Sequence, residues 1–189
     1  MRIGIPSTTQ PISTDSIVNS VWFTFLQNVW RAIRGELNLS LGGMLNVNTT
    51  SVSNATTLET NLITYSLGAN SLINQGDTLE IDAWGTYAAN VNSKTVKLVF
   101  GSQTILTTGA IVTNDGSWSI NAKIIMKTST TQEIISSILS SNNSVSDSAT
   151  RTAGTQDLGT ALTIKFTGTG VNSGDIIQYA LKINLTPNT

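Results

Sequence analysis

The sequence predicts a mainly β protein, an antiparallel jelly-roll-like β-sandwich preceded by an N-terminal α-helix and an extended arm. Three observations support this prediction. Residues 58–189 contain a series of segments in which apolar and polar residues alternate, which is the period of a strand with one buried face. Glycine, asparagine and aspartate separate these segments, as turns between strands require. Residues 15–34 instead carry apolar residues at steps of three and four, which is the period of a helix.

The first 35 residues form the predicted attachment segment. Pro6 and Pro11 indicate an extended lead-in, and Asp15 is the last of three consecutive N-cap candidates before the helix. The apolar face of this helix is wide and rich in aromatic rings, so we expect it to be buried against other copies of the chain or another protein. The interface residues that we expect are Val18, Trp22, Phe23, Phe25, Leu26, Val29 and Trp30.

A membrane-spanning role for this segment is not expected. The uncharged stretch over residues 16–30 covers fifteen positions and includes several amide and hydroxyl side chains, whereas a spanning helix needs about 20 predominantly apolar residues. The first residues also lack the charged, apolar and small-residue regions of a signal peptide.

Two further regions follow the attachment segment. Residues 36–57 are predicted to form an arm or linker, with one or two short strands before a stretch rich in serine, threonine and asparagine. Residues 58–189 form the predicted β-sandwich domain, in which residues 133–141 fit a strand or a short helix and a strand is favoured. The inward-facing residues expected from alternation are Leu79, Ile81, Ala83, Val96, Leu98, Phe100, Trp118, Ile120, Ala122, Ile124, Met126, Leu162, Ile164, Phe166, Ile177, Tyr179, Leu181, Ile183 and Leu185.

The same short pattern occurs before two of these strands. INQGDTLEI and VNSGDIIQY each place Asn-x-Gly-Asp, at residues 74–77 and 172–175, ahead of an alternating segment. We interpret this as one turn chemistry used twice, with a glycine at positive φ and an Asx cap.

The composition limits the chemistry that the chain can perform. Charged residues make up 11% of the 189 residues and the formal net charge is −1, so nucleic acid is not an expected partner. The sequence contains no cysteine and no histidine, which excludes disulfides, thiolate or imidazole metal ligands and nucleophiles activated by histidine. We expect no cofactor and no metal site.

Glu80 and Asp82 are the carboxylates that could act as a catalytic pair. They lie two positions apart in a predicted strand, so their side chains share one face, and paired carboxylates can hydrolyse glycosides. They are also the polar positions that alternate with apolar residues on the opposite face. We favour this interpretation as a solvated face, and we assign no catalytic residue.

Trp84 and Tyr87 are candidate contacts with a ligand or a subunit. Trp84 has the parity of Asp82, so strict alternation places its ring away from the core. Three interpretations stay open for it: a bulge at Trp84 and Gly85 that turns the ring inward, a contact with another subunit, or a platform on which a sugar ring stacks. Tyr65 is a further aromatic residue that could contribute to such a platform.

Two stretches resemble virion structural proteins of tailed bacteriophages. GDTLEIDAWGTYAANVNSKTVKLVFG at residues 76–101, followed by NDGSWSINAKIIMKTSTTQE at 114–133, is similar to a domain of such proteins. IPSTTQPISTDSIVNSVWFTFLQNVWRAI at residues 5–33 resembles their short N-terminal module, in which a lead-in with proline and a W-x-x-F helix precede a variable β domain.

The resemblance implies a non-enzymatic structural component of the virion. It would be a short fibre, a tail or collar protein, or a capsid-decorating protein that forms a homotrimer and docks on other virion proteins through its N-terminal segment. The length of the chain argues against a long fibre shaft. The alternative is a receptor- or carbohydrate-binding knob that recognises a glycan of the host surface. An enzyme that acts through Glu80 and Asp82 is the third and least favoured class.

Overall fold

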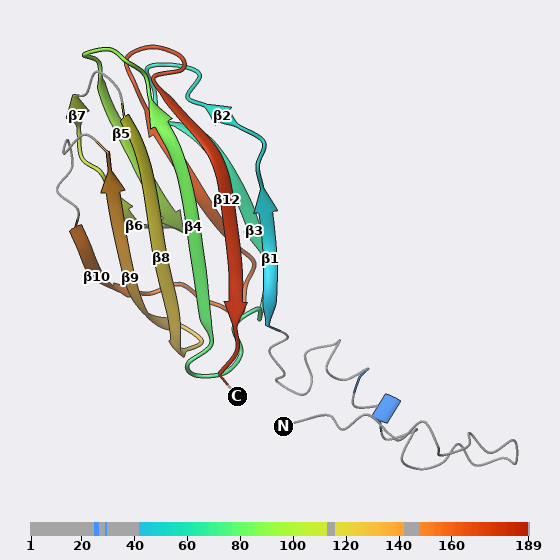
Figure 1. The fold of residues 1–189 in the computed structure, drawn as a ribbon. Coiled ribbons are helices and arrows are strands. Elements are labelled where there is room, and N and C mark those ends of the chain that lie inside the picture. The colour runs from blue at the N-terminus through green and yellow to red at the C-terminus, as the bar shows by residue number, and fades with distance from the viewer. Residues whose placement is uncertain (1–24, 27–28, 30–41, 113–115, 142–147, 189) are drawn as a thin grey trace, which may run out of the picture. The chain divides into compact units, whose positions relative to one another are not determined.

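Two antiparallel β-sheets packed face to face form the part of the chain from Leu41 to Asn188, which is one compact unit. Figure 1 shows a computed structural model, which describes residues 25–26, 29, 42–112, 116–141 and 148–188. The prediction of a mainly β sandwich is confirmed. The strands are β1 (Gly43–Asn48), β2 (Val52–Ser53), β3 (Thr60–Leu67), β4 (Thr78–Tyr87), β5 (Ser93–Phe100), β6 (Gln103–Thr107), β7 (Ile111–Val112), β8 (Gly116–Thr128), β9 (Thr131–Ser140), β10 (Ser148–Gly154), β11 (Leu162–Thr169) and β12 (Ile176–Thr186).

The chain passes repeatedly between the two sheets. The larger sheet has the order β1-β12-β4-β8-β9-β10, and β2 also pairs with β12. The smaller sheet has the order β3-β11-β5-β6, and β7 also pairs with β5. The first and last strands are therefore neighbours, and β12 lies beside β4 although about ninety residues separate them along the chain (Figure 1).

Most of the predicted attachment segment lies outside the described residues. Phe25, Leu26 and Val29 are described, and their backbone is helical. The other residues of the expected interface, Val18, Trp22, Phe23 and Trp30, are not among the described residues, so that interface stays a prediction. Within the described part of the chain, no helix has the length and apolar character needed to cross a membrane.

The predicted arm contributes two strands to the larger sheet. From residue 42 onward, the segment 36–57 is described, and it contains β1 and β2. Gly43 of β1 lies opposite Leu185, and Ser53 of β2 lies opposite Ile177, so both strands pair with β12. Downstream, residues 133–140 lie in β9, which confirms the strand interpretation for that region.

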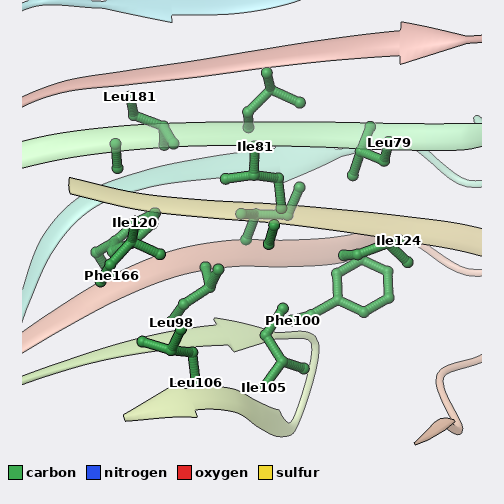
Figure 2. Packing of buried hydrophobic residues seen from close by; sticks show 14 of the residues in the cluster. Leu79, Ile81, Leu98, Phe100, Ile105, Leu106, Ile120, Ile124, Phe166 and Leu181 are labelled. Carbon is green, nitrogen blue, oxygen red and sulfur yellow. The ribbon is translucent and has the colours of Figure 1, made fainter. Parts of the chain in front are cut away.

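The alternating segments bury the predicted faces between the sheets. Figure 2 shows Ile81 and Leu181 of the larger sheet and Leu98 of the smaller sheet in one cluster. Across the same core, the rings of Trp118 and Phe166 stack with their centroids 6.2 Å apart. Each such side chain contributes roughly 1.5–3 kcal/mol by leaving water, so this core is the main source of the domain's stability.

The expectation for the start of β12 was wrong because the strand contains a bulge. Its pairing with β4 shifts register between Gln178 and Ala180, and this one-residue shift reverses the side-chain parity. Before the shift, Ile176 and Gln178 point inward and are fully buried, whereas Tyr179 is exposed on the outer face. After it, Leu181, Ile183 and Leu185 are buried as predicted.

The two Asn-x-Gly-Asp turns have the predicted geometry. In the first turn, Oδ2 of Asp77 accepts hydrogen bonds from the backbone N–H groups of Ile73 and Asn74. In the second turn, Oδ2 of Asp175 accepts the corresponding bonds from Val171 and Asn172. The glycines that precede these aspartates, Gly76 and Gly174, have φ values of 92° and 80°. Residues other than glycine rarely adopt this backbone conformation.

A buried polar cluster joins the second turn to the loop between β4 and β5. Asp175 accepts hydrogen bonds from the side-chain amides of Asn90, at 2.8 Å, and Asn92, at 3.0 Å. The ammonium group of Lys94 donates to the backbone carbonyls of the same two asparagines, each at 3.0 Å. Lys94 and Asp175 are both almost completely buried, so the asparagines connect two opposite charges inside the domain.

Candidate functional site

The outer face of the larger sheet is the candidate functional surface, because Trp84 stands on it. Trp84 lies between Ala180 of β12 and Ser119 of β8 in the strand pairing. Both neighbours are small, so the indole projects from the sheet and remains 45% exposed. The bulge that the sequence allowed at Trp84 and Gly85 lies instead in the neighbouring strand β12. Trp84 itself therefore follows the alternation of β4.

A groove of about 510 Å³ surrounds this ring. We call it the Trp84 groove. It runs across β12, β4, β8 and β9, which are adjacent in the larger sheet (Figure 1). Its outward-facing side chains are Trp84, Thr86, Ser117, Ser119, Leu139 and Tyr179. The volume lies within the roughly 300–1,000 Å³ of typical small-molecule sites.

The bulge in β12 positions the second aromatic ring of the groove. Tyr179 is the extra residue between Gln178 and Ala180, and its ring is 41% exposed on the same face as Trp84. Thr86 Oγ1 donates a hydrogen bond of 3.4 Å to the Tyr179 hydroxyl. On the other side of Trp84, β9 contributes the exposed side chain of Leu139.

Gly85 and Trp118 form the floor of the groove. Gly85 lies directly opposite Trp118 in the pairing of β4 with β8, and a Cβ at Gly85 would lie 2.5 Å from Cζ2 of the Trp118 ring. The absence of a side chain at this position therefore lets the indole pack under the β4 backbone. The Trp118 Nε1 atom is buried and has no hydrogen-bond partner in the described part of the chain.

Tyr87 does not contribute to this surface. It has the parity of Ala83 and Gly85, so its side chain points into the core and is 1% exposed. Burial raises the pKa of its hydroxyl, which finds no partner among the described residues. The structure thus corrects the grouping of Tyr87 with Trp84 as a surface contact. Tyr65 is half-buried and packs against the hydrophobic core.

The two candidate carboxylates lie further along the outer face of β4. Glu80 forms an ion pair of 2.9 Å with Lys123, and this hydrogen bond holds the pKa of the Glu80 carboxyl below its usual range. A general acid in glycoside hydrolysis needs the opposite shift. Asp82 accepts a hydrogen bond of 2.7 Å from Asn121. Within the described ranges, no group of acidic side chains could hold a metal ion.

Sequence reasoning identified Trp84 but missed Tyr179 and Leu139 as parts of the same surface. The parity shift at Tyr179 has a local signal, because apolar pairs at residues 176–177 and 180–181 break the strict alternation of β12. Leu139 has no comparable signal. It joins the groove only because β9 is the neighbour of β8 in the larger sheet.

Comparison with known proteins gives a weak structural likeness and no family. No protein-family model matches the chain, and no curated protein matches it in sequence. Among solved structures, the chain is similar to one described as "Crystal structure of infectious bursal disease virus VP2 subviral particle", with 14% identity and a TM-score of 0.23. The likeness covers 76% of this chain and 42% of that chain, and at this TM-score it carries no argument about function.

Proposed function

We propose that this chain is a non-enzymatic structural component of a bacteriophage virion, built on a jelly roll. The observation that carries the proposal is the order of its two modules: the aromatic segment resembling a phage attachment module precedes the β domain. It would act as a short fibre, a tail or collar protein, or a capsid-decorating protein.

The strand order supports the jelly roll. In a jelly roll, eight strands form two Greek keys, and viral capsid and lectin domains use this architecture. Here β1, β12, β4 and β8 lie in one sheet, and β3, β11, β5 and β6 lie in the other. When these eight strands are taken in chain order, each one pairs with the strands that it would have as neighbours in a fold of two Greek keys. Strands β9 and β10 extend the first sheet. The step from this fold to a virion role is analogy.

Assembly is the second part of the proposal. The resemblance implies a homotrimer that docks on other virion proteins through residues 1–35. Trp22, Phe25 and Trp30 lie in a helical pattern with apolar residues at neighbouring turns. Aromatic side chains at the centre of an interface usually supply most of its binding energy.

We expect the full-length protein to have three times the chain mass in solution, as measured by light scattering coupled to size exclusion. A truncated chain that begins at Leu41, the start of the compact β unit, separates two ways of assembling. If it remains trimeric, the β domain carries the assembly and the aromatic segment is available to dock on the particle. If only the full-length chain is trimeric, Trp22, Phe25 and Trp30 hold the copies together.

A monodisperse full-length monomer at micromolar concentration would contradict the proposed assembly. The virion role has a separate test, in which gold-labelled antibodies against the β domain are applied to particles of the phage that encodes the chain. Labelling of a defined part of the particle is expected, and intact particles without the protein would overturn the role.

A second candidate function is a knob that binds a glycan of the host surface. The Trp84 groove favours it, because the groove combines two exposed aromatic rings with several hydroxyl groups. This function is compatible with the first, and the two differ in whether the β domain has a ligand.

A further inference from the structure

Exposed aromatic faces distinguish the Trp84 groove from the rest of the outer face. Trp84 and Tyr179 remain 45% and 41% exposed, although aromatic rings contribute most to stability when they are buried. The exposed side chain of Leu139 adds to the same apolar surface. An apolar hollow rimmed by polar groups on a folded domain is a typical ligand-binding site.

We propose that the Trp84 groove binds a neutral saccharide, with one sugar ring packed against the Trp84 indole. One face of a pyranose ring presents C–H groups, whose partial positive charge matches the negative face of an aromatic ring. Its hydroxyl groups project from the edges of the ring and need hydrogen-bond partners. The proposal rests on the second function above and is independent of the first.

The polar groups of the groove match these sugar hydroxyls. Thr86, Ser117 and Ser119 line the groove next to Trp84, and a serine or threonine hydroxyl can both donate and accept, as a sugar hydroxyl does. The Ser117 and Ser119 hydroxyls form no hydrogen bond within the described residues. The Tyr179 hydroxyl, which accepts from Thr86 at 3.4 Å, keeps its own proton to donate.

The absence of charge in the lining favours a neutral ligand. None of the described residues that line the groove is acidic or basic. A phosphate or a sugar acid would therefore meet no cation inside the groove, although such ligands are usually bound by arginine or lysine. The nearest carboxylate along β4 is Asp82, which already accepts a hydrogen bond from Asn121.

The extent of the apolar surface favours a small ligand over a second copy of the chain. A stable interface between proteins buries about 800 Å² on each partner around an apolar centre. Along β4 and β8, the apolar surface is bounded by Asp82 and Asn121, and then by the ion pair of Glu80 with Lys123. Polar side chains thus interrupt the apolar surface of the groove along β4 and β8.

Saturation-transfer NMR on the full-length protein tests the proposal. The probes are methyl glycosides of glucose, galactose, mannose and N-acetylglucosamine at millimolar concentrations, with sialic acid and glucuronic acid as charged comparisons. We expect transfer to the ring C–H protons of at least one neutral glycoside. In Trp84→Ala we expect the affinity for that glycoside to fall at least about tenfold, and in Trp84→Phe to fall less, because a smaller aromatic face remains.

Leu58→Ala is the matched control, because Leu58 is 74% exposed and lies outside the groove. It should bind like the wild type. The proposal is overturned if no neutral glycoside binds, if only the charged sugars bind, or if Trp84→Ala binds as tightly as Leu58→Ala.

The solution mass of Trp84→Ala distinguishes a sugar site from a subunit contact. We expect an unchanged mass. A lower mass than that of the wild type would assign the groove to a subunit interface and overturn the saccharide proposal, while the assembly proposal would stand. Conversely, a wild-type monomer that binds a glycoside would support the sugar site and contradict the proposed trimer.

Discussion

Replacing Asp175 with alanine is expected to lower the free energy of unfolding of the β domain by about 3–5 kcal/mol. The substitution removes the acceptor for Asn90 and Asn92 and for two backbone N–H groups of the turn. It also removes the carboxylate whose negative charge favours the protonated form of the buried Lys94. Total stabilities of small domains are about 5–15 kcal/mol, so urea unfolding followed by tryptophan fluorescence should show a large decrease in midpoint.

Asp157→Ala is the matched control for this substitution. Asp157 is exposed and accepts one backbone hydrogen bond, from Gly159 at 2.9 Å, so its replacement should cost about 1 kcal/mol or less. If Asp175→Ala were no more destabilised than Asp157→Ala, the buried cluster would contribute no more to the stability of the fold than the exposed turn at Asp157.

The carboxylate of Asp175 should also make the free energy of unfolding depend on pH in the acid range. Burial of Asp175 disfavours its charged form, but the hydrogen bonds from Asn172, Asn90 and Asn92 outweigh burial and lower its pKa from the ordinary value of 3.8. The stabilisation is therefore fully present above the pKa of the unfolded chain and is lost as the pH falls through the lower pKa of the folded state. We expect the wild-type midpoint to decrease as the pH falls through and below the ordinary value of 3.8.

Asp175→Asn isolates this contribution, because its side chain cannot titrate. Other carboxylates with lowered pKa values, such as Glu59 and Glu80, are unchanged in that variant. Its unfolding midpoint should therefore vary less with acid pH than that of the wild type. Parallel pH profiles for the two proteins would show that Asp175 does not cause the dependence.

Replacing Gly85 with alanine is expected to destabilise the domain by about 3 kcal/mol or more, at the upper end of the cost of overpacking. A Cβ at this position would overlap the carbonyl oxygen of Ile177 and lie 2.5 Å from the Trp118 ring. The carbonyl belongs to the backbone of β12 beside its bulge, so it cannot move away as a side-chain tip could. Urea unfolding and the near-ultraviolet circular dichroism of the tryptophans would measure the effect.

Gly168→Ala provides a comparison within the same domain. The atoms nearest to its Cβ would be side-chain methyl groups, Ile176 Cδ1 at 3.3 Å and Leu62 Cδ1 at 3.4 Å. These groups can shift by small rotations, so we expect a loss of about 1 kcal/mol. Equal losses at the two glycines would contradict the close approach of β12 and Trp118 to Gly85.

Local features of the sequence were sufficient for the fold class and for most of the core. The alternation in β4, β5 and β8 depends only on the extended backbone, which points successive side chains to opposite faces. Residues such as Ile81, Leu98 and Ile120 were therefore assigned correctly to the core. The two Asn-x-Gly-Asp turns were also predictable, because each forms its capping hydrogen bonds within five consecutive residues.

The sequence by itself thus determined a β-sandwich and singled out Trp84, and only the tertiary structure decided that its ring stays on the outer face and what surrounds it. The bulge in β12 reverses the parity of Tyr179, and the strand order places β12 and β8 on either side of β4 and β9 next to β8. Tyr179, Trp84 and Leu139 come from three strands that are distant in sequence. They form one groove because hydrogen-bonded strand pairing, rather than proximity along the chain, sets which side chains are neighbours on a sheet.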